Sequence, residues 1–383
     1  MRRRFIDNLR AYYQLAKPGI IYGNLITATA GFLLASKGSV DLGLLTSVLI
    51  GFSLVIGSAC VINNVIDRKI DKKMSRTRQR AVANGQIPVL NAVGFGIILG
   101  LAGFFILAAK TNRLVLAVGL IAAFFYLVLY GAAKRRTMHG TLVGAVPGAT
   151  PPLAGYLAVS SQFDTAALAL FLVLFFWQLP HFYAIAMFRT REYKAANLPV
   201  ISVVKASREV KTRILAYILI FTLAAASLSL LGYTSSSFLV IALLLGAAWF
   251  TYGVNNFEKY SHVIWARKMF FISLIVLSLM SLAIAADPVL SKTSWYNQPM
   301  LMVHIIVALA SVAYTTLLFF APSPNKFKAT YGLVAATLAS GTILVMSTQA
   351  NLVHACITGL IYIGAVTVAI IFAKQRFAKQ KTK

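Results

Sequence analysis

The chain has 383 residues, of which 59% are hydrophobic and 12% are charged. Its mean hydropathy of +0.79 excludes an ordinary soluble globular protein. The net charge of +27 arises from 36 basic and 9 acidic residues. The basic residues gather in alternate connections between apolar segments, which indicates membrane topology and not a nucleic-acid-binding surface.

The apolar segments predict an all-α polytopic membrane protein. Stretches of roughly 18 or more mostly apolar residues are long enough to cross a bilayer as helices, and we count about twelve of them. In chain order they lie near 20–36, 43–66, 90–109, 114–132, 142–159, 166–188, 213–232, 236–254, 268–286, 300–320, 330–347 and 353–373. Residues 1–19 precede them as an amphipathic, basic lead-in.

The connections between these segments alternate in charge. Every second connection is rich in Lys and Arg, whereas those at 160–165, 233–237 and 348–352 carry neither. Because basic loops stay on the cytoplasmic side, both termini and the loop after the second segment are expected in the cytoplasm of a bacterium, with the helices in its inner membrane. Cys60 and Cys356 both lie in apolar segments and indicate buried thiols, not a disulfide framework.

The polar end of the second apolar segment carries the most informative pattern. Asn63, Asp67 and Asp71 are spaced four residues apart, so on a helix they lie along one face. Carboxylates combined with substrate phosphates are typical Mg²⁺ ligands, and acidic residues are rare in this chain. The pattern predicts a metal–diphosphate site. The alternative is that the aspartates only pair with the adjacent Arg68 and Lys72.

Basic residues around these acids are candidate diphosphate ligands. Arg76 and Arg78 follow in the same loop, and Lys134 and Arg135 end the fourth apolar segment. Such side chains bind phosphate oxygens well, but they also serve as ordinary charge on the cytoplasmic side. The segment 142–159 is dense in Gly and Pro, which predicts an irregular helix that lines a cavity or packs closely against others.

A second polar cluster follows the sixth segment. Trp177 and His181 lie near the cytoplasmic end of that segment, and Glu192 and Lys194 lie in the basic loop beyond it. Polar groups at a membrane helix end are candidates for a functional site, so we expect the two loops to face one another across a cavity. For His181 a role in binding substrate and a structural hydrogen bond are both open.

Turn-forming and interfacial aromatic residues at 287–299 indicate a linker. We expect the body of the protein over 20–286 and a membrane extension of three helices with a basic tail over 300–383. By topology, His304 and His354 lie near the outer ends of their helices at similar depth. Imidazole pairs can ligate haem iron, although helix packing is the simpler explanation for two single histidines.

Taken together, these motifs resemble the haem O synthase (protohaem IX farnesyltransferase) family of UbiA-like intramembrane prenyltransferases. The resemblance covers about residues 10–286. It rests on Lys17-Pro18-Gly19 with Gly23-Asn24, the block from Asn63 to Thr77, Lys134-Arg135 with Gly140-Thr141, Gly148-Ala149-Thr150-Pro151-Pro152, Trp177-Gln178-Leu179-Pro180-His181, and Tyr193-Lys194-Ala195-Ala196-Asn197-Leu198-Pro199. The Trp-Gln-x-Pro-His run separates the haem branch from the quinone branches.

The resemblance implies a nine-helix prenyltransferase fold and a set of site residues. Mg²⁺ and the diphosphate of farnesyl diphosphate are implied at Asn63, Asp67 and Asp71. Glu192 stands where the family usually has an aspartate, and it is implied as a further metal ligand. The implied diphosphate ligands are Arg76, Arg78, Lys134, Arg135 and Lys194. The residues implied to bind haem or substrate are His181, Trp177, Tyr183, Tyr130 and Asn24.

The implied reaction moves a farnesyl group to the C2 vinyl group of haem b, with addition of water, and yields haem O for a terminal oxidase, directly or through haem A synthase. Two alternatives stay open: a related prenyltransferase that acts on an aromatic or quinone precursor, and a membrane transporter. The extension has no counterpart in the resemblance. A third alternative concerns this extension alone: a module that handles haem or docks a partner. We expect membrane lipid to surround the helices, and we do not expect the protein to bind nucleic acid.

Overall fold

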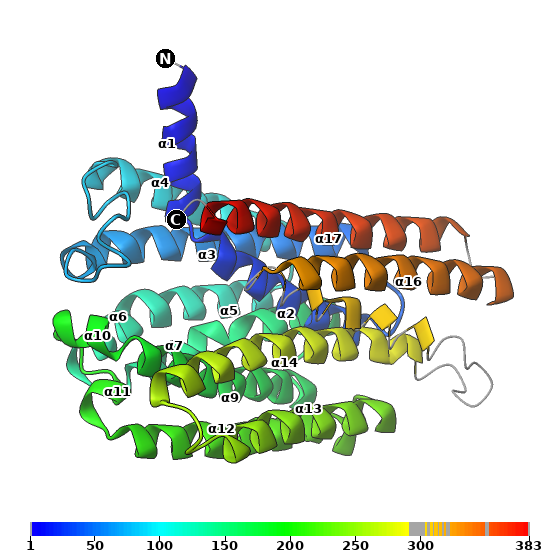
Figure 1. The fold of residues 1–383 in the computed structure, drawn as a ribbon. Helices are drawn as coiled ribbons and strands as arrows, with labels where there is room; N and C mark the ends of the chain where they lie inside the picture. Colours follow the sequence, from blue (N-terminus) through cyan, green and yellow to red (C-terminus); the bar gives the residue numbers. More distant parts are fainter. Residues whose placement is uncertain are drawn as a thin grey trace. The chain divides into compact units, whose positions relative to one another are not determined.

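The computed structural model describes residues 2–290, 322–348 and 352–381, and scattered positions within 303–318 (Figure 1). The described residues form helices and no strand. Ten of these helices are long and apolar enough to cross a membrane, which confirms the all-α membrane architecture. The chain divides into two compact units, residues 1–273 with 283–288 and residues 274–282 with 289–383, and each is described by itself.

The first unit begins with a lead-in helix and continues through the spans that match the predicted segments. Its helices are α1 Arg2–Leu15, α2 Pro18–Ser36, α3 Leu42–Asp71, α4 Val89–Lys110, α5 Arg113–Phe124, the π-helix η1 Phe125–Leu129, α6 Tyr130–Arg136, α7 Gly140–Gly148, α8 Thr150–Ser160, α9 Thr165–Phe188, α10 Thr190–Ala195, α11 Ile201–Val204, α12 Ser207–Leu230, α13 Ser236–Asn255 and α14 His262–Leu290. The last of these runs on into the second unit.

Short polar residues begin several of the long helices. Asp41 precedes α3, and its carboxylate accepts a hydrogen bond from the backbone N–H of Leu44 at 2.9 Å. Asp164 does the same for α9 through the N–H of Ala167 at 2.9 Å. Both carboxylates satisfy a free N–H of the first helical turn, where the helix dipole also favours negative charge. Two of the nine acidic residues therefore have a capping role.

Two glycines let α2 and α8 approach backbone to backbone. A Cβ placed on Gly31 would lie 2.0 Å from the carbonyl oxygen of Pro152, and one on Gly155 would lie 1.9 Å from that of Ala28. No side chain fits at either position without moving a helix. Small residues at such contacts are typical of membrane helix pairs, where close packing replaces the hydrophobic driving force.

The irregular helix expected over 142–159 is confirmed. It consists of α7 and α8, which meet at Ala149 and Thr150, with Pro147, Pro151 and Pro152 around the junction. Proline removes a backbone donor and clashes with the preceding turn, which ends a regular helix. Almost every residue of α8 is buried, so the break lies inside the bundle, where neighbouring helices surround it.

The fourth span contains a π-helical turn that the sequence pattern did not indicate. In η1 the backbone N–H of Tyr130 bonds to the carbonyl oxygen of Phe125, five residues earlier. Such turns are rare and frequently lie at functional sites. Here the turn immediately precedes α6, which carries Lys134 and Arg135.

The second unit contains α16 Pro324–Thr348 and α17 Leu352–Lys381. Leu318, Val366, Ile370 and Ala373 form a small apolar core within it. Most of the segment predicted at 300–320 and the side chain of His354 lie outside the described residues. The Nδ1 atom of His304 lies 2.9 Å from the hydroxyl of Ser340, so this histidine has a partner within its own unit. The expected His304–His354 pair stays a prediction.

Candidate active site

The carboxylate of Asp67 joins the end of α3 to the end of α6. The charge pattern predicts this end of α3 to lie on the cytoplasmic side. Asp67 accepts hydrogen bonds from Lys134 Nζ at 2.5 Å and from Arg135 Nη2 at 3.0 Å. Asn63 Oδ1 accepts from the same Lys134 ammonium at 2.8 Å. The side chains of Asp67 and Lys134 are each only 11% exposed. The structure therefore brings together four of the predicted site residues, which come from two helices about seventy residues apart in the chain.

Asp71 organises the loop that follows α3. Both of its carboxylate oxygens accept from Arg80 Nη1, at 2.9 and 2.8 Å. Its backbone carbonyl accepts from the hydroxyl of Thr77 at 2.9 Å. The side chain of Asp71 is almost completely buried, so the loop folds back over the helix end. In this structure the two aspartates thus pair across the site and not with the adjacent Arg68 and Lys72.

The oxygen atoms of Asn63 and Asp67 fit a magnesium ion that also binds phosphate. Both oxygens accept hydrogen bonds from one cation, the Lys134 ammonium. The two oxygens are therefore close enough to bind the same ion. Among the described residues, no cluster of three or more His, Cys, Asp or Glu side chains is arranged to hold a metal alone. Mg²⁺ is typically held by one or two carboxylates together with substrate phosphates, and this donor set matches that arrangement.

A second cluster forms around Glu192 in α10. Its carboxylate accepts from Arg189 Nη1 at 3.0 Å and lies 3.7 Å from Arg76 Nε. The Oε2 atom is buried and has no hydrogen-bond partner among the described residues. Burial raises the pKa of the adjacent Tyr193, while Arg76 and Arg189 oppose that rise. Glu192 thus retains an unused acceptor oxygen, as a ligand or substrate contact requires.

The two clusters face a common region. Arg76 of the loop after α3 lies 3.7 Å from Glu192 of α10, and Tyr193 packs against the small core that contains Met74 of the same loop. The ends of α6 and α10 and the loop after α3 lie at the same end of the bundle in Figure 1. The two polar loops thus lie next to one another, and the cavity expected between them stays a prediction.

Lys17 is a further candidate site residue that the sequence analysis did not select. It directly precedes α2 with a left-handed φ of 56°. Burial lowers the pKa of its ammonium, while attraction to Asp67 and Asp71 opposes that shift. Its ammonium has no hydrogen-bond partner within the described part of the chain. The carbonyl of Leu15, two residues before Lys17, accepts a hydrogen bond from Asn64 of α3 at 2.9 Å, which ties this turn to the helix that carries Asn63 and Asp67.

Aromatic rings of the fourth span lie beside the Lys134 ammonium. Tyr126 and Tyr130 stack with ring centroids 5.6 Å apart, and Lys134 Nζ lies 4.9 Å from the centroid of Tyr130. The face of a tyrosine ring attracts cations.

His181 lies in α9 among aromatic side chains. Its ring stacks on Trp177 at 4.7 Å between centroids and lies 4.9 Å from the ring of Phe270. Its Nδ1 atom lies 2.7 Å from the hydroxyl of Ser273, and the indole N–H of Trp177 donates to the backbone carbonyl of Ser273 at 2.9 Å. The predicted pair Trp177 and His181 therefore forms one buried cluster with α14.

The remaining candidates have less informative surroundings. Tyr183 is buried against Tyr217 of α12, with 5.8 Å between ring centroids. The amide of Asn24 donates to the carbonyl of Ile20 in its own helix. Arg78 and Lys194 are exposed, and neither has an ion-pair partner within the described ranges. Their roles stay predictions.

A family model described as "UbiA prenyltransferase family" matches residues 24–275. The chain belongs to the UbiA prenyltransferase family. Among its relatives, a protoheme IX farnesyltransferase of Photorhabdus laumondii is 42% identical over 281 residues, which cover 73% of this chain and 96% of that relative. A protein of the same name from Cronobacter sakazakii is 41% identical over 280 residues, 73% of this chain and 95% of the relative.

Solved structures of UbiA proteins share the fold. A digeranylgeranylglyceryl phosphate synthase matches with a TM-score of 0.62 and 17% identity, over 74% of this chain and 99% of its own. A UbiA homologue of Archaeoglobus fulgidus, solved with GPP and Mg²⁺, matches with a TM-score of 0.58 and 17% identity, over 72% and 99%. The resemblance inferred from the motifs is thus confirmed, and this UbiA protein is an integral membrane enzyme.

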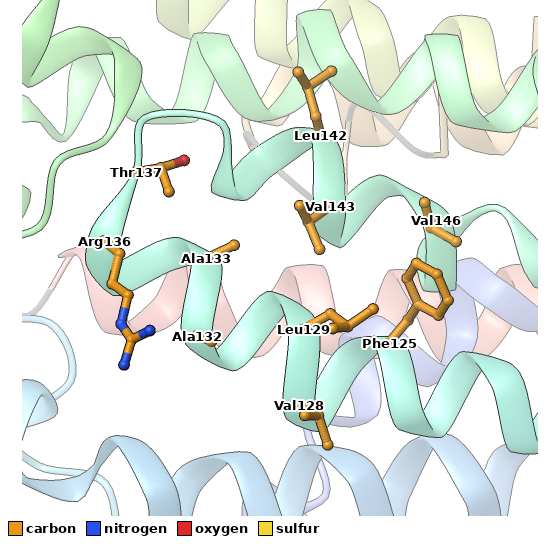
Figure 2. A pocket seen from close by; sticks show the side chains of 10 residues that line it. All are labelled: Phe125, Val128, Leu129, Ala132, Ala133, Arg136, Thr137, Leu142, Val143 and Val146. Carbon is orange, nitrogen blue, oxygen red and sulfur yellow. The ribbon is translucent and has the colours of Figure 1, made fainter.

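Helix α6, which carries Lys134 and Arg135, also borders an apolar groove. A hollow of about 590 Å³ lies between η1–α6 and α7 (Figure 2). Figure 2 shows Phe125, Leu129, Val143 and Val146 along it. None of its lining residues belongs to the Asp67 cluster, so the groove and the polar site are separate features.

Proposed function

We propose that this chain transfers the farnesyl group of farnesyl diphosphate to haem b and forms haem O. The observation that carries the proposal is the pairing of Asn63 and Asp67 with Lys134 and Arg135 in a chain 42% identical to named protoheme IX farnesyltransferases. The polar site supports prenyl-diphosphate chemistry, and the relatives' name supports haem as the acceptor. An aromatic or quinone acceptor would need the same polar site.

The polar site binds the diphosphate of the prenyl donor. Asn63 and Asp67 would hold Mg²⁺, with Asp71 and Glu192 as further proposed ligands. The bound ion would neutralise the diphosphate and make it a better leaving group. With the oxygens of Asn63 and Asp67 turned to the metal ion, Lys134 and Arg135 would be free to donate hydrogen bonds to the phosphate oxygens as negative charge develops on them. Preorganised donors of this kind act on charge that appears in the transition state.

The bond between C1 and oxygen breaks, and diphosphate leaves with the electron pair. Tyr126 and Tyr130 face the allylic cation with their rings, and the surrounding apolar helices keep water from reaching it early. The vinyl group of haem b attacks C1, a water oxygen then adds to the new cation on the haem side chain, and the proton of that water passes to diphosphate or solvent. The products are haem O and diphosphate.

The placement in the cell follows from the charge pattern. Both termini and the polar site lie on the cytoplasmic side of a bacterial inner membrane, where farnesyl diphosphate is soluble and accessible. The body over 20–286 carries the reaction, and the extension over 300–383 docks a partner such as haem A synthase or a terminal oxidase, or handles haem through His304 and His354.

The test is the haem content of membranes that contain this chain, measured by reversed-phase chromatography with mass detection. The wild type is expected to produce haem O, and the Asp67→Asn/Asp71→Asn variant is expected to produce none. Asp41→Asn is the matched control, because Asp41 lies on the opposite end of α3 and only caps it. Haem b alone, in membranes with inserted wild-type protein and farnesyl diphosphate, would contradict the assignment and direct the assay to quinone precursors.

A further inference from the structure

Ser273 of α14 makes three hydrogen bonds that together fix the His181 cluster. Its hydroxyl lies 2.7 Å from His181 Nδ1 and donates to the backbone carbonyl of Phe270 at 2.6 Å. Its own backbone carbonyl accepts from the indole N–H of Trp177 at 2.9 Å. Ser273 is completely buried. One residue thus contacts both Trp177 and His181 from ninety or more positions away in the sequence.

These contacts favour one of the two neutral tautomers of His181. A hydroxyl has a single proton, and a backbone carbonyl can only accept, so the 2.6 Å contact between Ser273 Oγ and the Phe270 carbonyl oxygen is a hydrogen bond only if that proton lies between them. Toward His181 the hydroxyl oxygen is therefore an acceptor, and Nδ1 carries the N–H that it accepts. Nε2 then bears the free lone pair, since a neutral imidazole has one donor and one acceptor nitrogen.

The ring of His181 is also fixed in orientation. Trp177 stacks on one side with 24° between the ring planes, and Phe270 lies 4.9 Å away between centroids. Nε2 has no hydrogen-bond partner in the described part of the protein, yet it does not belong to the fully buried atoms that lack one. Its lone pair is thus held in one direction and is free to bind.

We propose that Ser273 is a positioning residue that holds His181 as the Nδ1–H tautomer, so that Nε2 binds the iron of the haem substrate. This inference rests on the proposed function, because only a haem acceptor brings iron to the site. A neutral imidazole nitrogen is a common axial ligand of haem iron. Hydrogen bonds to the other ring nitrogen fix the tautomer and ring direction of metal-bound histidines.

Iron ligation would orient the acceptor for the transfer. Haem b has two vinyl groups, and a bond from His181 to the iron would fix the depth and tilt of the porphyrin in the site. A reacting vinyl group held in one place lowers the entropic cost of the attack on the farnesyl cation. His181 would touch the substrate, whereas Ser273 would act only through His181.

The test is a titration of the purified full-length protein with ferric haem b, followed by absorption and electron paramagnetic resonance spectra. The wild type is expected to give the spectrum of histidine-ligated haem. His181→Ala is expected to lose it and to regain it with added imidazole. Ser273→Ala is expected to bind haem about tenfold more weakly with an altered spectrum, since outer-shell partners of metal ligands typically contribute 10–100-fold in affinity. Ser273→Thr keeps the hydroxyl and is expected to retain the wild-type spectrum.

Ser227→Ala is the matched control. Its hydroxyl donates to the carbonyl of Ala224, three residues earlier in α12, as that of Ser273 does to Phe270, but no histidine is attached to it. A Ser273→Ala protein that matches wild type in affinity and spectrum, or a loss of equal size in Ser227→Ala, would overturn the proposal. If either of these two results is found while the wild type forms haem O, the Ser273 proposal is wrong and the proposed function stands. If wild type neither binds haem nor forms haem O, the proposed function fails first.

Discussion

Removing the charge of Asp67 should separate two effects that the structure combines at one carboxylate. Asp67 neutralises Lys134 and Arg135, and in the proposed function it also contributes to binding Mg²⁺ and diphosphate. Asp67→Asn keeps the shape of the side chain and removes its charge. Lys134 is then left with the Asn63 oxygen and a neutral amide in surroundings where its side chain is 11% exposed.

The expected losses have different sizes. Breaking one partner out of a buried ion pair costs about 3–5 kcal/mol, and we expect about 2 kcal/mol here because Arg135 is 39% exposed and solvent reaches that side of the pair. The effect on turnover is separate. Losing one group that acts on developing charge typically costs a factor of roughly 10² to 10³, or about 2.7–4 kcal/mol in the transition state.

A double-mutant cycle with Lys134→Met distinguishes the two roles. In the double variant neither buried charge remains, so the thermal stability in detergent should return most of the way to wild type. Haem O formation should stay at or below that of the weaker single variant, because both groups act on the diphosphate. The measurements are thermal unfolding and single-turnover product formation with matched protein amounts.

Two results would refute this reasoning. Recovery of activity together with stability in the double variant would mean that Asp67 serves only to neutralise Lys134. Wild-type activity in Asp67→Asn alone would mean that the carboxylate takes no part in the reaction. Asp41→Asn, at the other end of the same helix, should alter neither activity nor the cycle.

Three further outcomes are expected. Gly155→Ala should lower the stability in thermal unfolding by about 1–3 kcal/mol, because its Cβ would lie 1.9 Å from the carbonyl oxygen of Ala28. Gly131→Ala should have much less effect, because no atom lies within 4 Å of its Cβ. Equal losses in the two variants would contradict the close α2–α8 contact. Arg80→Met should speed proteolysis of the loop after α3, since it removes the partner of Asp71; an unchanged cleavage rate would contradict that role. Chelation of divalent cations should stop haem O formation and added Mg²⁺ should restore it, and full activity in the chelator would refute the metal site.

Helical spacing was sufficient to predict one face of the site. Asn63 and Asp67 recur at four-residue intervals at the end of an apolar segment, and the structure brings both onto the same ammonium. The basic ends of the fourth and sixth segments could be selected because charge is rare in this chain and its positions mark the membrane boundary. Periodicity and charge are local properties, and they predicted local structure well.

Contacts between residues that are distant in the sequence or lie in irregular backbone could not be predicted in the same way. The loop 72–88 has no period, so nothing in the sequence indicates that Arg80, and not Arg78, reaches Asp71. Ser273 is an ordinary serine in an apolar helix, and only the packing of α14 against α9 gives it His181 as a neighbour. Lys17 owes its position to a left-handed backbone turn before a proline.

The π-helical turn in the fourth span has a consequence for changes in chain length. A regular helix advances by about 100° per residue, so a residue removed within α6 would turn Lys134 away from Asp67. The wide turn at η1 contains one residue more than an α-helix needs, and removing one there would let the span become regular while its two ends keep their directions. Deletion of a single residue should therefore be tolerated within Phe125–Leu129 but not between Tyr130 and Arg135.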